Sequence, residues 1–509
     1  MAGTITKTVT DPRKAGLNPG AAWAISPDES LHGGRMGRMA GRGSLVGVAL
    51  LLALWFGQAG RLYSQASKLD RPPPSRPESA REEEAPRSES SPGPAASSTG
   101  MEVGQLLRAR FDEGVSFSTP DDHFVLRLRL MEQTDFKLFV PTGQDPARSG
   151  MYIPRFRVYF EGNAGRSFEY ELSLQRSIEG TFDVLDANIN YRPSDAFMIQ
   201  FGRFLVPYSY EWFDHLEQFF ITPERGLFPL NFGLSREAGI MAWGKVLDDR
   251  LQYAVGGFSG QLEGLADTNT TRDAVGYLNY RPFLNNPKSL FRYLNVGGSI
   301  ALGQQSYIEK PLPMRTSVQS SENDEAARGA SFIFLDFEDD VVAHGPRRQG
   351  AVHLAWYQRQ LSLEAEAQLG RFTYQKLFVS AQVPVVGYNV TLGYFITGEE
   401  VTRRTVVRPL RPFDPVAGQY GTGAIELFAR YSYLHLGEAV FDANLANRED
   451  WSNNARITDI GLNWYPNDYL KMYLDWQHAW FGSPVLWNVA EGKKSRVNDL
   501  FWLRAQIFF

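Results

Sequence analysis

The sequence predicts an all-β protein, and three observations carry this prediction. Between residue 120 and the C-terminus, apolar and polar residues alternate with a period of two, which is typical of strands with one apolar face. Turn-forming residues separate the alternating segments, as at Asp248-Asp249 and Pro466-Asn467-Asp468. Apolar spacings of three and four residues, which would predict helices, are hardly visible. We therefore expect a chain of antiparallel strands.

Composition narrows the class of protein. The chain has 509 residues, of which 21% are charged, 43% hydrophobic and 13% aromatic. A polytopic helical membrane protein is excluded because it needs repeated apolar runs of about 20 residues. The formal net charge of -5 argues against a nucleic-acid-binding protein, which usually has a strongly basic surface. Because the sequence contains no cysteine, disulfide bonds and thiolate metal sites are excluded.

The N-terminal region predicts an export signal and a tether. Residues 45–66 hold the apolar run LVGVALLLALWF and a small-residue cleavage site, which together with a preceding basic flank indicate a secretory signal peptide. Residues 1–44 form an N-terminal extension and the basic flank, and we expect translation to start at Met36 or Met39. Residues 67–113 are a disordered linker, rich in Pro, Ser and Glu, followed by the lead-in to the barrel.

The alternation is most regular in the segment 166–175, RSFEYELSLQ. Its apolar residues share one face of a strand, and its polar residues share the other. The pattern recurs in six further segments: 124–130, 155–160, 185–191, 361–369, 470–477 and 501–509.

Two architectures explain repeated half-apolar strands. A soluble sandwich or barrel turns the apolar face inward, whereas an outer-membrane barrel turns it toward lipid and encloses a wet lumen. The signal peptide, the high aromatic content and a final strand that ends on Phe509 favour the second architecture. We therefore predict a transmembrane antiparallel β-barrel in the outer membrane of a Gram-negative-type bacterium. The alternative is a secreted all-β protein that binds or hydrolyses carbohydrate.

Three blocks of the sequence resemble the phosphate-selective porin O and P family. The first block is Phe201–Glu211 followed by Ile221–Arg225, the second spans parts of 393–432, and the third is Gly461–Tyr465. The resemblance extends from about residue 114 to 509, the segment that we assign to the barrel. It implies a homotrimer of 16-stranded barrels, each with a constriction loop folded into the pore.

Charged residues on the polar strand faces are the expected lining of the pore, because a wet pore selects ions by the sign of its lining charges. Five arginines could form a basic track for anions along one wall, a feature that the family resemblance also leads one to expect. Equally, two glutamates on the next strand could pair with Arg155 and Arg157 and neutralise them. The pore-lining candidates are Arg127, Arg129, Arg155, Arg157, Arg504, Glu169 and Glu171.

The predicted constriction loop, Tyr208 to Leu230, has an acidic composition. It carries four carboxylates against one arginine. Phosphate-selective members place lysines near the constriction, and this loop contains none, which argues against phosphate as the solute. Its seven aromatic side chains suit either sugar binding or, as we favour, packing against the wall. The candidate residues of this loop are Glu211, Trp212, Asp214, His215, Glu217 and Arg225.

Motifs for enzymatic chemistry or cofactor binding do not occur. The sequence holds no P-loop, no HExxH, no GxSxG and no histidine spacing suited to a metal. We expect no catalytic residues, no cofactor, no metal and no nucleic-acid partner. The predicted function is passive diffusion of small hydrophilic solutes, including anions such as phosphate, through a protein embedded in outer-membrane lipid.

Overall fold

A computed structural model describes residues 107–111, 113–176, 178, 182–260, 270–307, 309–318 and 325–509. The predicted N-terminal extension, the signal peptide and most of the linker lie outside the described residues. Within the described part of the chain, no helix is long and apolar enough to cross a membrane.

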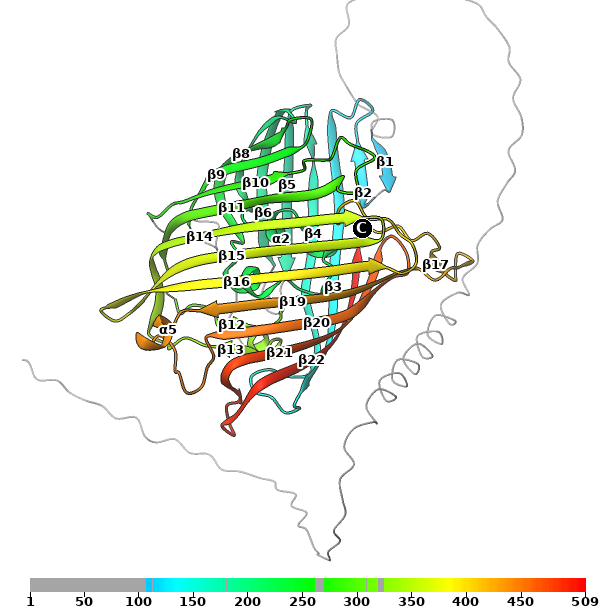
Figure 1. The fold of residues 1–509 in the computed structure, drawn as a ribbon. Helices are drawn as coiled ribbons and strands as arrows, with labels where there is room; N and C mark the ends of the chain where they lie inside the picture. The colour runs from blue at the N-terminus through cyan, green and yellow to red at the C-terminus, as the bar shows by residue number, and fades with distance from the viewer. Residues whose placement is uncertain are drawn as a thin grey trace, which may run out of the picture. The chain divides into compact units, whose positions relative to one another are not determined.

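Sixteen antiparallel strands form a closed barrel (Figure 1). Each strand pairs with its neighbour along the chain, and the last strand, β22, pairs with the first, β3, so that Arg504 lies opposite Asp135. The predicted fold class and strand number are therefore confirmed. The barrel strands are β3 (Phe124–Val140), β4 (Gly150–Ala164), β5 (Phe168–Arg176), β6 (Asp183–Ser194), β7 (Phe197–Leu205), β8 (Arg236–Val246), β9 (Leu251–Phe258), β10 (Asp273–Tyr280), β11 (Tyr293–Ser306), β14 (Val341–Gln358), β15 (Leu361–Lys376), β16 (Val379–Phe395), β19 (Ala424–Leu436), β20 (Asn454–Tyr465), β21 (Leu470–Asn488) and β22 (Lys493–Phe508).

A short hairpin precedes the barrel. It consists of β1 (Arg108–Phe111) and β2 (Val115–Ser118), and β2 pairs with the first residues of β3. Because β22 pairs with β3 only from Met131 onward, β2 covers the part of the β3 edge that β22 leaves free. The hairpin thus protects a strand edge that would otherwise lack partners.

The side chains of the barrel are oriented with apolar groups outside and charged groups inside. Phe168 and Leu474 are 48% and 41% exposed, whereas Arg157 is 3% exposed. A soluble barrel would show the opposite arrangement, since its apolar side chains would fill a dry centre. The orientation is that of a membrane barrel, and the alternative of a secreted soluble protein was wrong.

The connections differ between the two ends of the barrel. At the end where β3 begins and β22 stops, here called the turn end, most connections are short: 165–167, 195–196, 247–250, 281–292, 359–360 and 466–469. One connection at this end, residues 396–423, is much longer and is here called the long turn. It carries the strands β17 (Phe413–Asp414) and β18 (Gln419–Tyr420).

Longer connections dominate at the opposite end, here called the loop end. The segment 307–340 carries β12 (Met314–Arg315), α4 (Glu325–Gly329) and β13 (Ile333–Leu335), and the segment 437–453 carries α5 (Ala439–Asp442). Short periplasmic turns and longer extracellular loops are the usual asymmetry of outer-membrane barrels, so the turn end corresponds to the periplasmic side.

The connection between β7 and β8, residues 206–235, folds into the barrel and is here called the inner loop. It contains α2 (Tyr210–Phe213), a 3-10 helix (Glu217–Phe219) and α3 (Leu227–Phe232), and most of its residues are buried. Figure 1 shows α2 behind the front strands of the wall. The predicted constriction loop, Tyr208 to Leu230, lies within this segment.

Candidate functional site

The first turn of the inner loop is held by the carboxylate of Glu366 on β15. This carboxylate accepts hydrogen bonds from the backbone N–H groups of Tyr210 (3.0 Å) and Glu211 (3.2 Å) and from the hydroxyl of Ser209 (3.0 Å). The first N–H groups of a helix have no partner within the helix, so a nearby carboxylate stabilises them. A residue of the wall thereby fixes the position at which the loop enters the lumen.

The end of α2 packs on a group of hydroxyl and carboxyl side chains from β14 and β15. The Tyr357 hydroxyl lies 3.2 Å from the Tyr210 hydroxyl, 3.1 Å from Nε2 of His215 and 3.0 Å from Oε1 of Glu364. The ring of Tyr210 also stacks on His353, with 4.6 Å between centroids. Aromatic packing therefore accounts for part of the aromatic content of the loop, in line with the interpretation that the sequence favoured.

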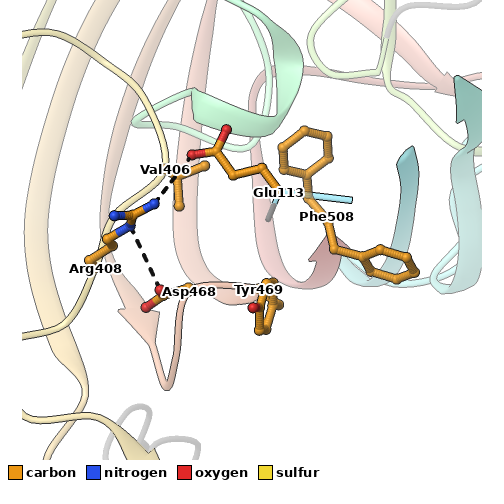
Figure 2. A pocket seen from close by; sticks show the side chains of 7 residues that line it. Glu113, Val406, Arg408, Asp468, Tyr469 and Phe508 are labelled. Atoms are coloured by element: carbon orange, nitrogen blue, oxygen red, sulfur yellow. Dashed lines mark ion pairs between the residues drawn. The ribbon is translucent and has the colours of Figure 1, made fainter. Parts of the chain in front are cut away.

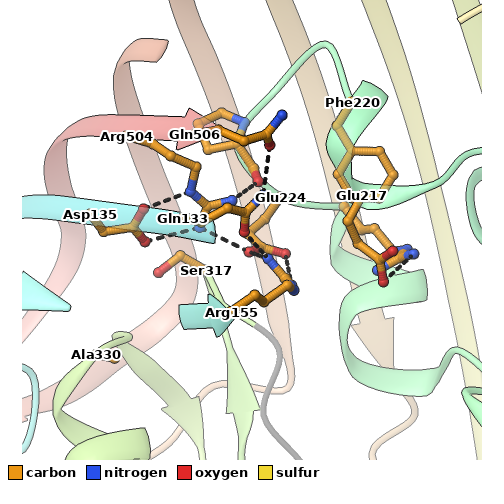
Figure 3. A network of polar contacts seen from close by, with 12 residues as sticks. Gln133, Asp135, Arg155, Glu217, Phe220, Glu224, Ser317, Ala330, Arg504 and Gln506 are labelled. Atoms are coloured by element: carbon orange, nitrogen blue, oxygen red, sulfur yellow. Dashed lines mark hydrogen bonds and ion pairs between the residues drawn. The ribbon is translucent and has the colours of Figure 1, made fainter. Parts of the chain in front are cut away.

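The second half of the inner loop is bound to the wall by two carboxylates. Glu224 forms ion pairs with Arg155 of β4 at 2.6 Å and with Arg504 of β22 at 3.1 Å (Figure 3). Glu217 forms ion pairs with three arginines: Arg157 at 2.8 Å, Arg225 at 3.2 Å and Arg236 at 3.6 Å. These five arginines are called the arginine cluster below.

The arginine cluster contains more carboxylates than the two of the loop. Asp135 of β3 pairs with Arg504 at 2.6 Å, and Asp186 of β6 pairs with Arg236 at 3.3 Å. Five arginines therefore contact four carboxylates, and the ammonium of Lys137 lies 3.9 Å from Asp135. The cluster as a whole keeps an excess of positive charge.

One arginine of the cluster belongs to the loop itself. The guanidinium carbon of Arg225 lies 3.5 Å from the ring centroid of Trp212 and 4.7 Å from that of Phe220. A cation over an aromatic face is attracted by the negative charge of that face, and the attraction is stronger in a site without water. Trp212 and Phe220 therefore hold the guanidinium in the centre of the loop.

Backbone carbonyls of the inner loop accept further hydrogen bonds from the strands β20, β21 and β22. Gln506 of β22 donates to the Gln218 carbonyl at 3.0 Å, and Asn463 of β20 donates to the Ile221 carbonyl at 2.8 Å. The ammonium of Lys471 on β21 contacts the Phe220 carbonyl. The inner loop itself has no lysine, but Lys471 of the wall lies directly beside it.

Burial and arginine contacts have opposite effects on the loop carboxylates. Burial raises the pKa of Glu224, but its arginine partners outweigh this effect and lower the pKa to about 2. Burial also opposes ionisation of Glu217, and its three arginines hold the pKa well below the ordinary value. Burial lowers the pKa of His215 to about 3 because the charged form loses its hydration. At neutral pH both carboxylates are ionised and the histidine is neutral.

The long turn also reaches into the barrel and meets the inner loop. Arg404 donates to both oxygens of Glu426 on β19, at 2.6 and 3.0 Å, and to the Phe219 carbonyl at 3.2 Å. Val406 and Phe219 both pack against the cluster formed by Met131, Tyr159 and Phe508. The two connections, which enter from opposite ends of the barrel, are therefore in direct contact.

Two adjoining cavities lie where the long turn meets the start of β21 and the end of β22. Their volumes are about 290 and 340 Å³. Figure 2 shows the first cavity, in which Arg408 of the long turn pairs with Glu113 at 3.6 Å and with Asp468 at 3.8 Å. The second cavity is lined by both inserted connections, including Gln218 and Thr405. Both cavities lie at the turn end of the barrel.

The structure separates the predicted arginines into two groups. Arg155, Arg157 and Arg504 are buried and belong to the arginine cluster, whereas Arg127 is exposed near the turn end. Arg129 pairs with Glu161 at 3.3 Å. The expectation that Arg504 would join the others because β22 pairs with β3 agrees with the observed register. The role of these arginines in selecting ions stays a prediction.

The alternative pairing of Arg155 and Arg157 with two glutamates of β5 was wrong. In the register of β4 and β5, Glu171 lies opposite Glu161, and Glu169 lies opposite Asn163, so both glutamates sit nearer the turn end than the arginines do. Glu169 pairs instead with Arg192 at 2.6 Å. The arginines are neutralised by the inner loop, which strand patterns do not reveal.

Of the six predicted loop residues, four lie in or beside the arginine cluster, while His215 contacts Tyr357 of β14 and Asp214 accepts a hydrogen bond from Gln252 of β9. Glu217 and Arg225 belong to the arginine cluster, Trp212 stacks on Arg225, and Glu211 accepts a hydrogen bond from the backbone N–H of Gly226 at 2.9 Å. Several residues that hold the loop were missed by the sequence interpretation: Glu366, Tyr357, Arg236 and Lys471 of the wall, and Arg404 of the long turn. For the four wall residues, an inward position on alternating strands was the available signal.

Comparisons with known proteins place this geometry in a family. The model of the family described as phosphate-selective porin O and P matches residues 126–479. The chain belongs to this family. A member of the phosphate-selective porin O and P family is an outer-membrane porin, a channel through which small hydrophilic solutes diffuse passively.

The chain is similar to individual known proteins to different degrees. Porin O of Pseudomonas aeruginosa is 23% identical over 391 residues, which cover 70% of this chain and 84% of that protein. Among solved structures, the outer-membrane protein OmpT of Vibrio cholerae in its trimer form has a TM-score of 0.46 at 9% identity, over 76% of this chain and 100% of that one. An anion-selective porin from Comamonas acidovorans has a TM-score of 0.45 at 12% identity, with the same coverage.

Proposed function

We propose that this porin prefers small anions, and that the arginine cluster is the element that selects them. The observation that carries the proposal is the excess of arginines over carboxylates around Glu217 and Glu224. In a narrow, poorly hydrated passage, an excess of fixed positive charge attracts anions and repels cations.

The proposed mechanism combines exclusion by width with electrostatic filtering. The inner loop and the long turn both narrow the lumen, and the bonds of Glu366 and Arg404 keep these two segments in place. Because the paired side chains are already oriented, an anion that passes needs no rearrangement of the wall. The mechanism involves no covalent chemistry, no catalytic residue and no cofactor.

The chemistry of the arginine cluster indicates how strongly the porin would distinguish one anion from another. Arginine binds phosphate and carboxylate with two parallel hydrogen bonds, and lysine offers a single point charge. Most guanidinium groups here already donate to carboxylates, which leaves few donors for tight binding of phosphate. We therefore propose weak, general anion selectivity, with phosphate as one of several permeant anions.

Two further proposals concern assembly and export. The porin assembles as a homotrimer, as membership of the family implies, and residues 45–66 act as a cleaved signal peptide. A gel of unheated protein tests the first proposal, since a trimer that dissociates only on heating is expected. Determination of the mature N-terminus tests the second. An N-terminal peptide of the uncleaved precursor that mapped upstream of Met36 would refute the expected translation start.

Ion selectivity is tested by reversal potentials in planar bilayers. Purified porin is measured in a tenfold gradient of potassium chloride, and then with phosphate in place of chloride. The expected result is a reversal potential of the sign that chloride permeation gives. The variant Arg225→Gln should lower the anion preference, while Lys288→Gln, at an exposed site in a turn, should leave it unchanged. Cation preference of the wild-type channel would refute the proposal.

A further inference from the structure

Two arginines lie directly opposite each other on the outside of the barrel. Arg348 of β14 and Arg371 of β15 are paired in register, and both side chains are exposed. Neither guanidinium makes an ion pair or a hydrogen bond with any residue that the structure describes. Like charges that face each other across a strand pair are destabilising, so this arrangement calls for a compensating anion.

The neighbouring strands supply no such anion. Arg348 lies beside Leu302 of β11, and Arg371 lies beside Pro384 of β16. Along the outward faces of these four strands, all of which are described, no aspartate or glutamate occurs. No residue that the structure describes pairs with either guanidinium, so we assign the compensating charge to another molecule.

The position of the pair along the barrel identifies its surroundings. Arg371 lies ten residues from Leu361, where β15 begins at the turn end, and Arg348 lies ten residues from Gln358, where β14 stops there. For tilted strands this corresponds to a height of roughly 25 Å, which is the height of the apolar band of outer-membrane barrels. The pair therefore lies at the outer edge of that band, on the side away from the periplasm.

Apolar side chains lead from the pair into the band. Leu302 lies opposite Arg348, Val352 and Leu369 lie on the side of the band, and all three side chains are exposed. On β15, every outward residue between Leu361 and Leu369 is apolar. A ligand of this surface is consequently expected to combine a negatively charged head with hydrocarbon chains.

From this arrangement we infer that Arg348 and Arg371 bind the phosphate of an outer-leaflet lipid headgroup. Two adjacent guanidinium groups present several N–H donors to one phosphate, which suits the fork geometry of arginine. The acyl chains then lie along Leu369 and Val352. A phosphate free in solution would meet the same charges but would gain nothing from the apolar strip below them.

Binding is tested with a defined lipid. The folded porin is purified in detergent, exposed to lipid A that carries two phosphates, and examined by native mass spectrometry. The wild type should retain about tenfold more lipid than the variant Arg348→Gln/Arg371→Gln, since each basic group near a headgroup adds to the binding of anionic lipid. The matched control, Lys288→Gln/Arg359→Gln, removes two exposed charges at the turn end and should bind like the wild type.

Three results would overturn the inference. The first is that Arg348→Gln/Arg371→Gln retains as much lipid as the wild type. The second is that the wild type retains lipid A without phosphates as well as it retains intact lipid A. The third is that inorganic phosphate alone binds with the same affinity as the lipid. Folding of each variant is checked by its mobility on an unheated gel. If the double variant does not fold, Arg348→Gln and Arg371→Gln are measured singly, and lipid retention that neither of them lowers refutes the site. The lysine variant Arg348→Lys/Arg371→Lys should restore part of the binding.

Discussion

Arg155 of β4 donates two hydrogen bonds to the carboxylate of Glu224 in the inner loop, at 2.6 and 2.8 Å. Both side chains are almost completely buried. The pair joins the barrel wall to the segment that crosses the lumen. Removal of Glu224 leaves the Arg155 guanidinium buried without a carboxylate, whereas removal of Arg155 leaves Glu224 with Arg504 as its one paired cation.

The first prediction concerns this pair. Arg155→Gln or Glu224→Gln alone should weaken attachment of the loop by about 3–5 kcal/mol, the usual cost of breaking a buried ion pair. We expect larger current noise and a higher mean single-channel conductance for each single variant. The double variant Arg155→Gln/Glu224→Gln should recover part of the quiet wild-type behaviour, because no charge is then left unpaired. Equal noise in all four proteins would contradict the assigned role of the pair.

The second prediction concerns the entry of the loop into the lumen. Glu366→Ala removes the carboxylate that accepts three hydrogen bonds from the start of α2 and should release the first half of the loop. The variant should admit larger uncharged solutes, which liposome-swelling rates measure. Glu169→Gln is the matched control, since Glu169 also faces inward but pairs with Arg192 away from the loop. Faster swelling in the control than in Glu366→Ala would count against the anchor.

Much of the fold follows from side-chain alternation. A period of two predicts strands, and a first strand and a last strand that both alternate can close a barrel, as β3 and β22 do. Alternation alone does not show whether the apolar strand faces point outward to lipid or inward to a dry core, because a soluble barrel has the same pattern. The exposed Phe168 and buried Arg157 settle that choice in space.

The contacts of the inner loop could not be predicted from strand patterns. Arg155 and Glu224 are separated by 69 residues, and their contact depends on how the loop crosses the lumen. Likewise, nothing in the local sequence shows that Glu366 stabilises the start of α2. Contacts between a loop and a wall depend on the closed shape of the barrel, which no local pattern encodes.

The third prediction concerns pH. While the inner loop is docked in the lumen, His215 is buried and its pKa is about 3; when the loop is released, the pKa of His215 returns to near 6.5. The released loop therefore binds a proton more readily than the docked loop, and a fall in pH below about 6.5 favours release of the loop. Glu224 acts in the same direction at lower pH, because its docked pKa is about 2 and its stabilisation is complete only above its ordinary pKa of 4.5. Current noise should therefore be constant from pH 8 to 6.5 and then rise as the pH falls.

His215→Gln separates the two contributions to this pH dependence. Without the histidine, the rise in noise should begin only below about pH 4.5, where the carboxylate alone drives release. The measurement is current noise against pH at constant salt. An unchanged onset near pH 6.5 in His215→Gln would assign the transition to another group.

The fourth prediction concerns the contact between the two inserted segments. Arg404→Ala removes the bonds from the long turn to Glu426 and to the Phe219 carbonyl and leaves Glu426 buried without a partner cation. We expect a higher single-channel conductance together with lower thermal stability of the barrel. Arg408→Ala, which affects the same turn at a more exposed position, should change both quantities less. Single-channel recording and heat-induced unfolding on gels measure the two effects.

The last prediction tests the orientation of the wall with two neighbouring residues of one strand. Phe201 of β7 points outward and is 43% exposed, whereas Gln200 points inward and donates a hydrogen bond to Asn188. An arginine on the lipid-facing side near mid-membrane costs about 2–4 kcal/mol, but an arginine in a wet lumen does not incur this cost. Phe201→Arg should therefore lower the free energy of unfolding in lipid vesicles strongly, and Gln200→Arg should change it little and act on ion selectivity instead. If Gln200→Arg destabilised the barrel more than Phe201→Arg, the outward assignment of Phe201 would be untenable.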